Sequence, residues 1–254
     1  MLSNKVLASI LVITIAVFLT IGGSALGQEV ELDEASVFIE WNSTDGDHGI
    51  QFFWDSEGFT DMTVTNEQDG ELVVETSGNI FDQGLTEVGI ESVEPDESEQ
   101  TRAQFFARFP AGLYEFEGTP TEGDPITGEA ELTHDLLEPV VFKKIKLPVI
   151  EWIEPTLNDV TGEPLEVVGY ELVVELVVEI EVNDDEENGD TVERVFKETT
   201  NYPAGYTKHI VGNRFMKLIK NPPGEIIEGK VEILADEPSG NRSITEEAFI
   251  EEED

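Results

Sequence analysis

Hydrophobic and polar positions alternate most clearly between residues 170 and 182. All even positions in this stretch are apolar, whereas glutamates occupy the odd positions 171, 175, 179 and 181. A period of two is typical of a β-strand with one face in a core and the other in water. At ~3.3 Å per residue the strand is about 40 Å long, so we expect a bulge or a protruding hairpin. The turn lies at 183–190 and the return strand at 191–199.

Shorter runs rich in β-branched and aromatic residues recur in the first half of the chain, separated by Gly, Asp and Asn turns. The expected strands are 36–41, 49–54, 61–66, 71–76, 85–92, 113–118 and 126–134. This recurrence predicts a sandwich or meander, with 66–70 as a hairpin loop. The exception is 98–109, whose apolar spacing predicts a short helix with Ser98 as a candidate N-cap and Pro110 at its end.

A change in composition near residue 140 divides the chain. The stretch 136–149 gathers three of the 14 basic residues between two prolines. We therefore expect four parts after residue 27: an acidic lead-in at 28–35, a β-rich domain at 36–136, a linker at 137–148 and a second domain at 149–252. The predicted fold class is all-β, with two β-sandwich-like domains in tandem and one short helix in the first.

The N-terminus has the features of an export signal. Lys5 is followed by an uncharged run, and Ala25-Leu26-Gly27 places small residues at the −3 and −1 positions of a cleavage site before Gln28. We expect residues 1–27 to be a signal peptide. The run also approaches the ~20 residues of a membrane-spanning helix, so an uncleaved membrane anchor is the alternative. In both cases the rest of the chain is secreted, periplasmic or at the cell surface.

Charge and cysteine content exclude several classes of function. The chain has 56 acidic and 14 basic residues, and its net charge is −42. Nucleic-acid binding needs clustered cations and is excluded. The absence of cysteine excludes disulfides, zinc–thiolate sites and thiol catalysis. Because mutual repulsion is tolerated only where cations screen it, we expect an environment with salt or divalent ions.

The second half of the chain resembles a fibronectin type III domain. The resemblance rests on VIEWIEP (149–155), VVGYELVVE (167–175) and GEIIEGKVEILADEPSGNRSITEEAFI (224–250). It implies an immunoglobulin-like sandwich in which Trp152 belongs to the B strand and Tyr170 to the C strand. The chain departs from the family at Gly229, where the family has a tyrosine at the E–F corner. The first half, with TDGDHG (44–49) and RFPAGLYEFEGT (108–119), is loosely similar to an uncharacterised β-rich domain of exported prokaryotic proteins.

Two acidic segments are candidate metal sites. Asp45, Asp47 and His48 offer two carboxylates and an imidazole, although we favour a turn in which aspartates bond their own backbone. The second segment is the acidic hairpin tip at 183–190. It lacks the glutamate that an EF-hand needs at position 12, and it is flanked by strands instead of helices. It could still hold Ca²⁺ weakly. Its candidate ligands are Asp184, Asp185, Glu186 and Asp190.

Other candidate residues favour structural interpretations. Phe52 and Trp54 share a face and are expected in the core, which leaves Phe53 and Trp41 as candidates for a sugar-stacking platform. His134 and His209 are expected at surface or edge positions, the latter in a β-like run at 206–215. The sequons at Asn42 and Asn241 are expected to face outward at turns.

No enzyme motif is present. The chain contains no G-x-S-x-G, no H-E-x-x-H and no phosphate-binding Gly-Lys motif. We therefore expect an exported non-enzymatic protein without a cofactor, with a structural, adhesive or partner-binding role, whose partner is a protein or a surface polysaccharide. A carbohydrate-binding or weakly Ca²⁺-dependent recognition module is the alternative, and a hydrolase ranks third. Membrane contact is expected only through an uncleaved N-terminal segment.

Overall fold

The protein is built from three β-sheets. The computed structural model describes residues 30–56, 58–68, 70–78, 81–182 and 190–250. A seven-stranded sheet has the order β12 (Asp190–Pro203), β11 (Gly169–Val182), β14 (Glu225–Asp236), β15 (Arg242–Ile250), β2 (Glu34–Asn42), β3 (Asp47–Asp55) and β6 (Glu87–Glu91). A five-stranded sheet has the order β1 (Val30–Glu31), β8 (Ile126–Leu132), β7 (Gly112–Pro120), β4 (Phe59–Asn66) and β5 (Leu72–Ser77). A three-stranded sheet has the order β13 (Lys208–Ile210), β10 (Val149–Ile153) and β9 (Val141–Lys146).

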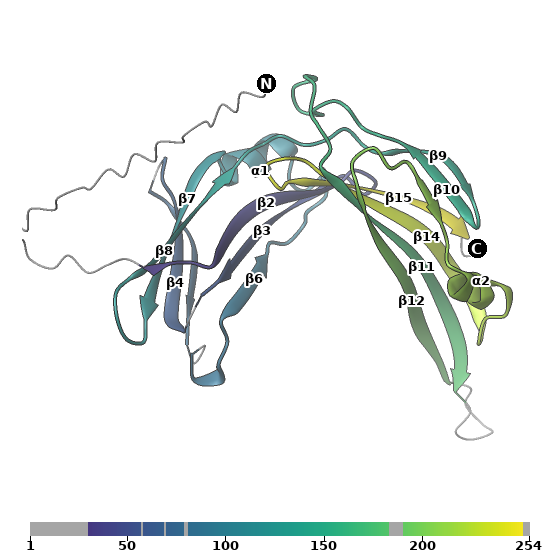
Figure 1. Ribbon diagram of the computed structural model, residues 1–254, viewed down its shortest axis with the longest axis horizontal. Helices are drawn as coiled ribbons and strands as arrows, with labels where there is room; N and C mark the ends of the chain where they lie inside the picture. Colours follow the sequence, from purple (N-terminus) through teal and green to yellow (C-terminus); the bar gives the residue numbers. More distant parts are fainter. Residues whose placement is uncertain (1–29, 57, 69, 79–80, 183–189, 251–254) are drawn as a thin grey trace, which may run out of the picture.

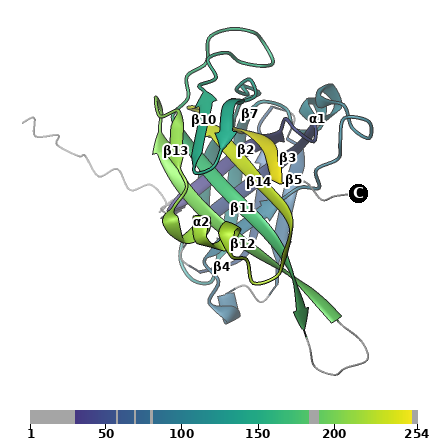
Figure 2. The same ribbon diagram turned by 90° about the vertical axis from the view of Figure 1, so that its right-hand side faces the viewer.

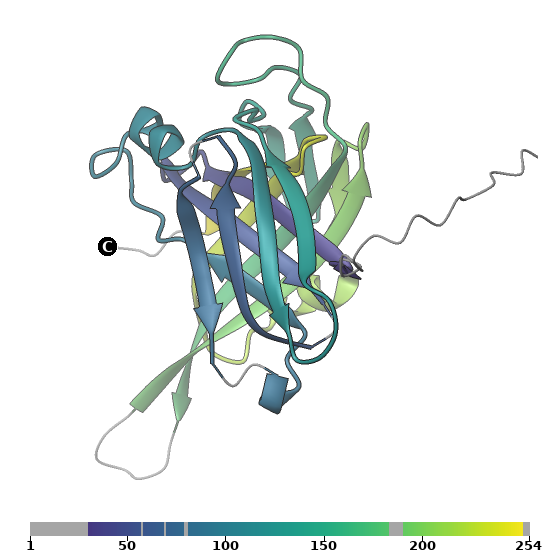
Figure 3. The same cartoon turned by 90° about the vertical axis from the view of Figure 1, so that its left-hand side faces the viewer.

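The sheets form an arch with two legs (Figure 1). The seven-stranded sheet runs through both legs on the inner side of the arch. The five-stranded sheet covers it on the outer side of one leg, as Figure 3 shows from that end. The three-stranded sheet covers it on the outer side of the other leg, as Figure 2 shows from the opposite end. Each leg is therefore a β-sandwich, and the predicted all-β fold is confirmed.

Each sandwich has its own core. The first core contains Trp54, Phe59 and Phe116, none of them exposed, between β2–β3 and the five-stranded sheet. The second core contains Trp152 and Tyr170, whose ring centroids lie 5.6 Å apart in an edge-to-face arrangement. Both residues are 2% exposed, as the resemblance to a fibronectin type III domain implies. Burial of such aromatic side chains provides most of the apolar area of a sandwich core.

The long alternating strand is β11, and it pairs with β12 along its whole length. Its even positions from Tyr170 to Val178 are buried, as predicted. A bulge lies at Val177–Val178 in the pairing with β14, and the β11–β12 hairpin extends beyond the other strands (Figure 2). The expectation that the second face contacts only water is wrong. Val173 on that face is 7% exposed because it clusters with Leu234 and Ile244 of the neighbouring strands.

The first helix, α1, spans Arg102–Arg108 and is shorter than predicted. Thr101 is its N-cap instead of Ser98, and its hydroxyl forms a capping box with Gln104. A second helix, α2, spans Asn213–Lys220 and replaces part of the β-like run expected at 206–215. Phe215 of α2 is buried against the second core, so tertiary packing overrides the local strand propensity there. A short 3₁₀ helix also lies at Phe81–Gln83.

The segment 137–148, expected as a linker, belongs to the second sandwich. It contains β9, which pairs with β10 from Lys146 opposite Val149 to Val141 opposite Ile153. Leu137 and Val140 are buried in the second core. The prolines that bracket this stretch therefore delimit an edge strand, a position in which proline is tolerated. The division of the chain into domains stays a prediction.

Gly229 is explained by packing. The ring of Phe249 lies over it, and a Cβ added to Gly229 would come within 2.5 Å of that ring. Glycine in a strand interior commonly marks such a close approach. A tyrosine-to-backbone bond of the kind found at immunoglobulin corners occurs in the first sandwich instead, where the Tyr114 hydroxyl donates to the carbonyl of Pro110 over 3.0 Å.

The position of Trp152 generates a stability prediction. Replacing Trp152 with Ala should lower the free energy of unfolding by about 3–5 kcal/mol, because it leaves a cavity against Tyr170 and Tyr202. Ile153→Ala is the matched control, since the side chain next in sequence is 54% exposed and should change stability by less than ~0.5 kcal/mol. Urea unfolding of residues 28–254 followed by far-UV circular dichroism measures both. Equal losses in the two variants would contradict the core assignment.

Candidate functional site

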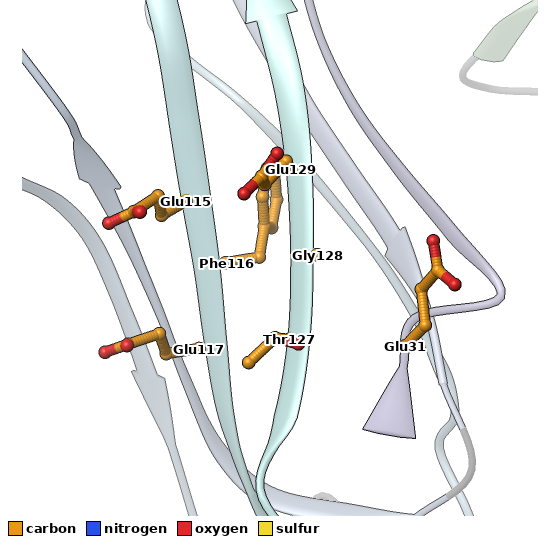
Figure 4. Close-up of a pocket in the computed structure, with 7 residues that line it drawn as sticks. All are labelled: Glu31, Glu115, Phe116, Glu117, Thr127, Gly128 and Glu129. Carbon is orange, nitrogen blue, oxygen red and sulfur yellow. The ribbon is translucent and has the colours of Figure 1, made fainter. Parts of the chain in front are cut away.

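The outer face of the five-stranded sheet is acidic. Glu115 on β7 lies directly opposite Glu129 on β8, and Glu117 lies opposite Thr127. The pairing of β1 with β8 brings Glu31 beside Thr127 as well. These side chains line a hollow of about 690 Å³ (Figure 4). Like charges directly opposite on a sheet are destabilising, so this arrangement has no stabilising role within the sandwich.

These carboxylates have no cationic partner among the described residues. We call the outward side of this sheet, centred on Glu31, Glu115, Glu117 and Glu129, the acidic face. On the same side, Thr127 lies between Glu31 and Glu117, and the threonines at positions 63 and 65 of β4 lie beside Glu117 and Glu115. The face can attract a cation or a basic surface. The part of the chain that the structure describes has no group of three or more His, Asp or Glu arranged to hold a metal ion.

The outer face of the three-stranded sheet is cationic. Lys144 on β9 and Lys208 on β13 lie on either side of Glu151 on β10. The Lys208 ammonium lies 3.1 Å from the Glu151 carboxylate, and this hydrogen bond, with the charges of the neighbouring lysines, lowers the pKa of Glu151. Lys146 lies in the next row of the sheet, beside Val149. We call the outward side of this sheet the cationic face.

Exposed apolar side chains accompany these lysines. Val141, Ile153 and Ile210 of the three-stranded sheet are each more than half exposed. Val141 lies opposite Ile153, and Ile210 lies opposite Val149. Apolar side chains scattered singly on a surface are ordinary, whereas three on one small sheet provide apolar area that a partner can cover.

The two sandwiches share one sheet because β15 pairs with β2. The pairing is parallel and short: Arg242, Ser243 and Ile244 lie opposite Glu40, Trp41 and Asn42. Ser43 extends it, since its backbone N–H donates to the carbonyl of Ile244 over 2.9 Å. The strands come from opposite ends of the chain. This pairing is the only place at which the seven-stranded sheet passes from one described sandwich to the other.

The Asn241 side chain joins three segments at this junction. It is 1% exposed. Its Oδ1 accepts the backbone N–H of Ile39 over 2.7 Å, and its Nδ2 donates to the Asp135 carbonyl over 2.9 Å and to Thr133. The expectation of an outward-facing sequon is therefore wrong for Asn241, because its amide nitrogen is buried and used. At Asn42 the amide nitrogen donates to Asp45 and Glu246.

A buried carboxylate holds the turn that presents Asn241. Glu237 is 2% exposed. Its carboxylate accepts the backbone N–H groups of Ser239 and Asn241, over 2.8 and 2.9 Å, and the Ser239 hydroxyl. Gly240 completes the turn with a φ of +99°, which favours glycine. Hydrogen bonds to a carboxylate are stronger than those between neutral groups, so the turn is rigid.

A second contact between the sandwiches contains His48. His48 is 3% exposed and stacks on Trp41, and its Nε2 accepts the Nε–H of Arg102 over 3.0 Å. Arg102 also donates to Asp159 of the second sandwich over 2.6 Å and lies over the Trp41 ring. Burial, with a further contribution from the Arg102 charge, lowers the pKa of His48 to about 4.

The segment containing Asp45 and Asp47 is a turn, as favoured from the sequence, but a different side chain forms it. Asn42 Oδ1 accepts the backbone N–H of Thr44 over 2.9 Å, so the asparagine and not an aspartate bonds the backbone. Burial and the charge of Asp45 raise the pKa of Asp47. His48 bonds Arg102 and not these carboxylates, so the three residues do not converge on a metal site.

A cluster of carboxylates lies on the inner side of the arch. Glu94 lies over Gly49, and burial followed by the charges of Asp47, Glu91 and Glu40 raises the pKa of Glu94 to about 7. Burial also raises the pKa of Asp236, although Arg242 lies 3.1 Å from it. Burial is the largest cause of both shifts, and neighbouring carboxylates add to the shift of Glu94.

The expected sugar-stacking platform is not formed as proposed. Phe52 and Trp54 are buried, as predicted, and Trp41 is also buried at 6% exposure. Phe53 is half-buried on the opposite face, beside Phe38 in a hollow of about 290 Å³. Trp41 therefore belongs to the core and to the His48 contact, and only Phe53 remains from the proposed pair.

The two other histidines contact the cores. His209 is 3% exposed, although β13 is an edge strand. Its Nδ1 lies 2.7 Å from the Tyr202 hydroxyl and its Nε2 lies 3.1 Å from Glu198. His209 therefore lies in an edge strand, as one of the two expected positions, but its side chain is buried and not at the surface. His134 stacks on Phe106 with centroids 3.9 Å apart and bonds the Phe109 carbonyl, so it fixes α1 to the end of β8.

The candidate calcium ligands Asp184, Asp185 and Glu186 lie outside the described residues. Asp190 is the first residue of β12 and lies opposite Val182. The N-terminal segment 1–27 also lies outside the described residues, and no described helix has the length and hydropathy needed to span a bilayer. The weak calcium site and the signal peptide stay predictions.

Comparison with known proteins gives only distant structural likenesses. No protein-family model matches the sequence, and no curated protein matches it. The structure is similar to that of a 1.5-MDa bacterial ice-binding adhesin described for host cell surface retention, with 10% identity and a TM-score of 0.25 over 87% of this chain and 64% of that one. It is also similar to the FN1–FN3 domains of chicken CNTN1, with 11% identity and a TM-score of 0.22 over 87% and 67% of the two chains.

A tetra-tandem repeat from the extending region of a large adhesion protein is a third such structure. It has 11% identity and a TM-score of 0.20 over 86% of this chain and 50% of that chain. The chain thus spans about half to two thirds of these structures. TM-scores in this range are too low to assign a function.

The buried amide at the junction generates a second prediction. Asn241→Ala should lower the free energy of unfolding by about 2–5 kcal/mol, because it leaves the Ile39 N–H and the Asp135 carbonyl without their buried partner. Asn201→Ala is the matched control at an exposed position of β12. Amide hydrogen exchange provides the specific readout: Ile39 should exchange faster in Asn241→Ala alone. Unchanged Ile39 protection would contradict the assigned role.

The environment of His48 generates a third prediction. Its imidazole should titrate near pH 4 in the folded protein, measured by NMR of the ring protons, against ~6.5 in the unfolded chain. As the pH falls from about 6.5 to about 4, only the unfolded state takes up this proton, so the stability contribution is lost over that window. His48→Gln should weaken this part of the pH dependence. A midpoint near 6.5 in the folded protein would contradict the prediction.

Proposed function

We propose that this chain is an exported, non-enzymatic protein with a structural or adhesive role outside the cell. The observation that supports it best is the shared seven-stranded sheet, which joins the two sandwiches in one arch and directs the two charged faces away from each other. Two domains connected by a plain linker move relative to each other by default. A rigid spacer that presents surfaces at its two ends fits a structural or adhesive protein.

The buried polar groups support this role. Asn241, Glu237, Ser243 and His48 are each at most 3% exposed, and each bonds a partner that fixes the junction or its turn. Enzymes instead direct buried, perturbed groups into a pocket. Here the large hollow is lined by glutamates on an outer sheet face.

The second sandwich is proposed to be fibronectin type III-like. The buried Trp152–Tyr170 pair and the turn between β14 and β15 support this proposal. One fold can serve many functions, as a spacer or as a binding module. The partner therefore has to be inferred from the exposed residues and not from the fold. For this chain those residues are the acidic and cationic faces, which suit a protein or a charged surface polysaccharide.

The proposed location and role can be tested in the native host. Protein recovered from the cell exterior should begin at Gln28, as shown by N-terminal sequencing, or retain Met1 in the membrane fraction if the segment is an anchor. Deletion of the gene should alter surface structure or attachment of cells to surfaces. Complementation with wild type should restore attachment.

A second experiment tests whether the function depends on the rigidity of the arch. Because the chain has no cysteine, pairs of introduced cysteines such as Thr63→Cys with Ile153→Cys allow clean spin labelling of the two outer sheets. The interspin distance distribution should be narrow in the wild-type background and broader with Asn241→Ala. Attachment that persists with Asn241→Ala at wild-type protein levels would reject the rigid arch as the basis of the function. Soluble cytoplasmic protein with an intact Met1 would reject export.

A further inference from the structure

We propose that the protein assembles head to tail, with the cationic face of one copy docked on the acidic face of the next. The proposal rests on the structural role above and names its partner as a second copy of this chain. The two faces lie at opposite ends of the arch and point outward in opposite directions (Figure 1). A contact between different faces of identical copies is heterologous and leaves a free face at each end, so the assembly can extend.

Charge is divided unevenly between the two sandwiches. Residues 28–136 contain 28 acidic and two basic residues, whereas residues 137–254 contain 28 acidic and 11 basic residues. Three lysines project from the small outer sheet of the second sandwich, against the single carboxylate of Glu151. On a chain with a net charge of −42, this cationic surface has its complement on the same chain, at the far end of the arch.

The two faces are compatible in shape and spacing. Both are outer faces of β-sheets, in which neighbouring strands lie about 4.8 Å apart and side chains on one face recur about every 7 Å along a strand. Lys144 and Lys208 lie two strands apart across β10, and Glu31 and Glu117 likewise lie two strands apart across β8. A three-stranded face can therefore lie within the area of a five-stranded one, with lysine side chains long enough to reach the carboxylates.

Apolar contact supplements the charges. Val141, Ile153 and Ile210 are each more than half exposed around the lysines. The threonines at positions 63, 65 and 127 place methyl groups next to the glutamates of the acidic face. Burying these groups together removes apolar area from water and so favours association. Exposed ion pairs contribute little binding free energy by themselves.

The net negative charge of two copies opposes their association unless salt screens it. Two chains that each carry a large negative charge repel one another at long range, and this repulsion is screened beyond the Debye length of ~10 Å at 0.1 M salt. Contacts between facing lysines and glutamates are shorter and survive this screening better. Association should therefore be strongest at intermediate ionic strength and weaken both in very low and in molar salt.

Analytical ultracentrifugation of residues 28–254 at ~0.1 M NaCl tests the proposal. The wild type should form dimers and longer species as the protein concentration rises from micromolar to submillimolar. K144Q/K146Q/K208Q should be monomeric, and so should E115Q/E117Q/E129Q. A mixture of these two variants should form a one-to-one dimer and stop there, because each copy then has only one intact face. Circular dichroism melts verify that both variants are folded.

E97Q/E99Q/E122Q is the matched control, since it changes the net charge equally but removes carboxylates outside the acidic face. It should associate like the wild type. A monomeric wild type at all concentrations and salt levels would overturn the proposal, as would elongation of the mixture beyond dimers. A monomeric chain whose lysine face instead retains an acidic polysaccharide would also overturn it. These outcomes leave the export and attachment tests of the proposed function unaffected.

Discussion

The parallel pairing of β15 with β2 is the contact on which the arch depends. It contains three residue pairs, and the strands are separated by about 200 positions in the sequence. So short a ladder cannot alone hold two sandwiches in a fixed orientation, because edge backbone groups next to it would be left unpaired. The Asn241 side chain solves this problem by accepting the Ile39 N–H where the strand pairing has ended. The amide thereby acts as an added element of the sheet.

Buried hydrogen bonds between polar groups, and not only apolar contacts, connect the segments around this pairing. Glu237 holds the turn, Ser243 donates to the Leu137 carbonyl, and Thr245 accepts the Val140 N–H. Each bond has a defined direction and length, whereas apolar contacts tolerate sliding. A satisfied polar network thus fixes the geometry of a junction, and its partial loss leaves buried groups without partners. The orientation of the two charged faces follows from this network.

The distribution of charge is the second organising feature. Repulsion within the acidic sandwich has no structural benefit, as the opposed Glu115 and Glu129 illustrate. Lysines are instead concentrated on the opposite outer face, where Lys208 and Lys144 surround Glu151. On the inner side of the arch, burial and then the charges of neighbouring carboxylates raise the pKa of Glu94 to about 7. The two outer faces therefore carry opposite charge, and the inner side combines carboxylates of raised pKa with the Arg242–Asp236 ion pair.

The sequence by itself determined most of the strands and the aromatic pair of the second core. Alternation over 170–182, turn residues every ten positions, and the Trp152 and Tyr170 motifs are local signals, and strand formation responds to local signals. Only the tertiary structure decided that Asn241 and His209 are buried, that 137–148 contains a core-facing strand, and that the two sandwiches share a sheet. These features depend on contacts between residues tens to hundreds of positions apart. From the sequence alone, a polar residue at a predicted turn, such as Asn241, is expected to be exposed. Its burial depends on a backbone group of a distant strand, here the Ile39 N–H, which the sequence pattern does not reveal.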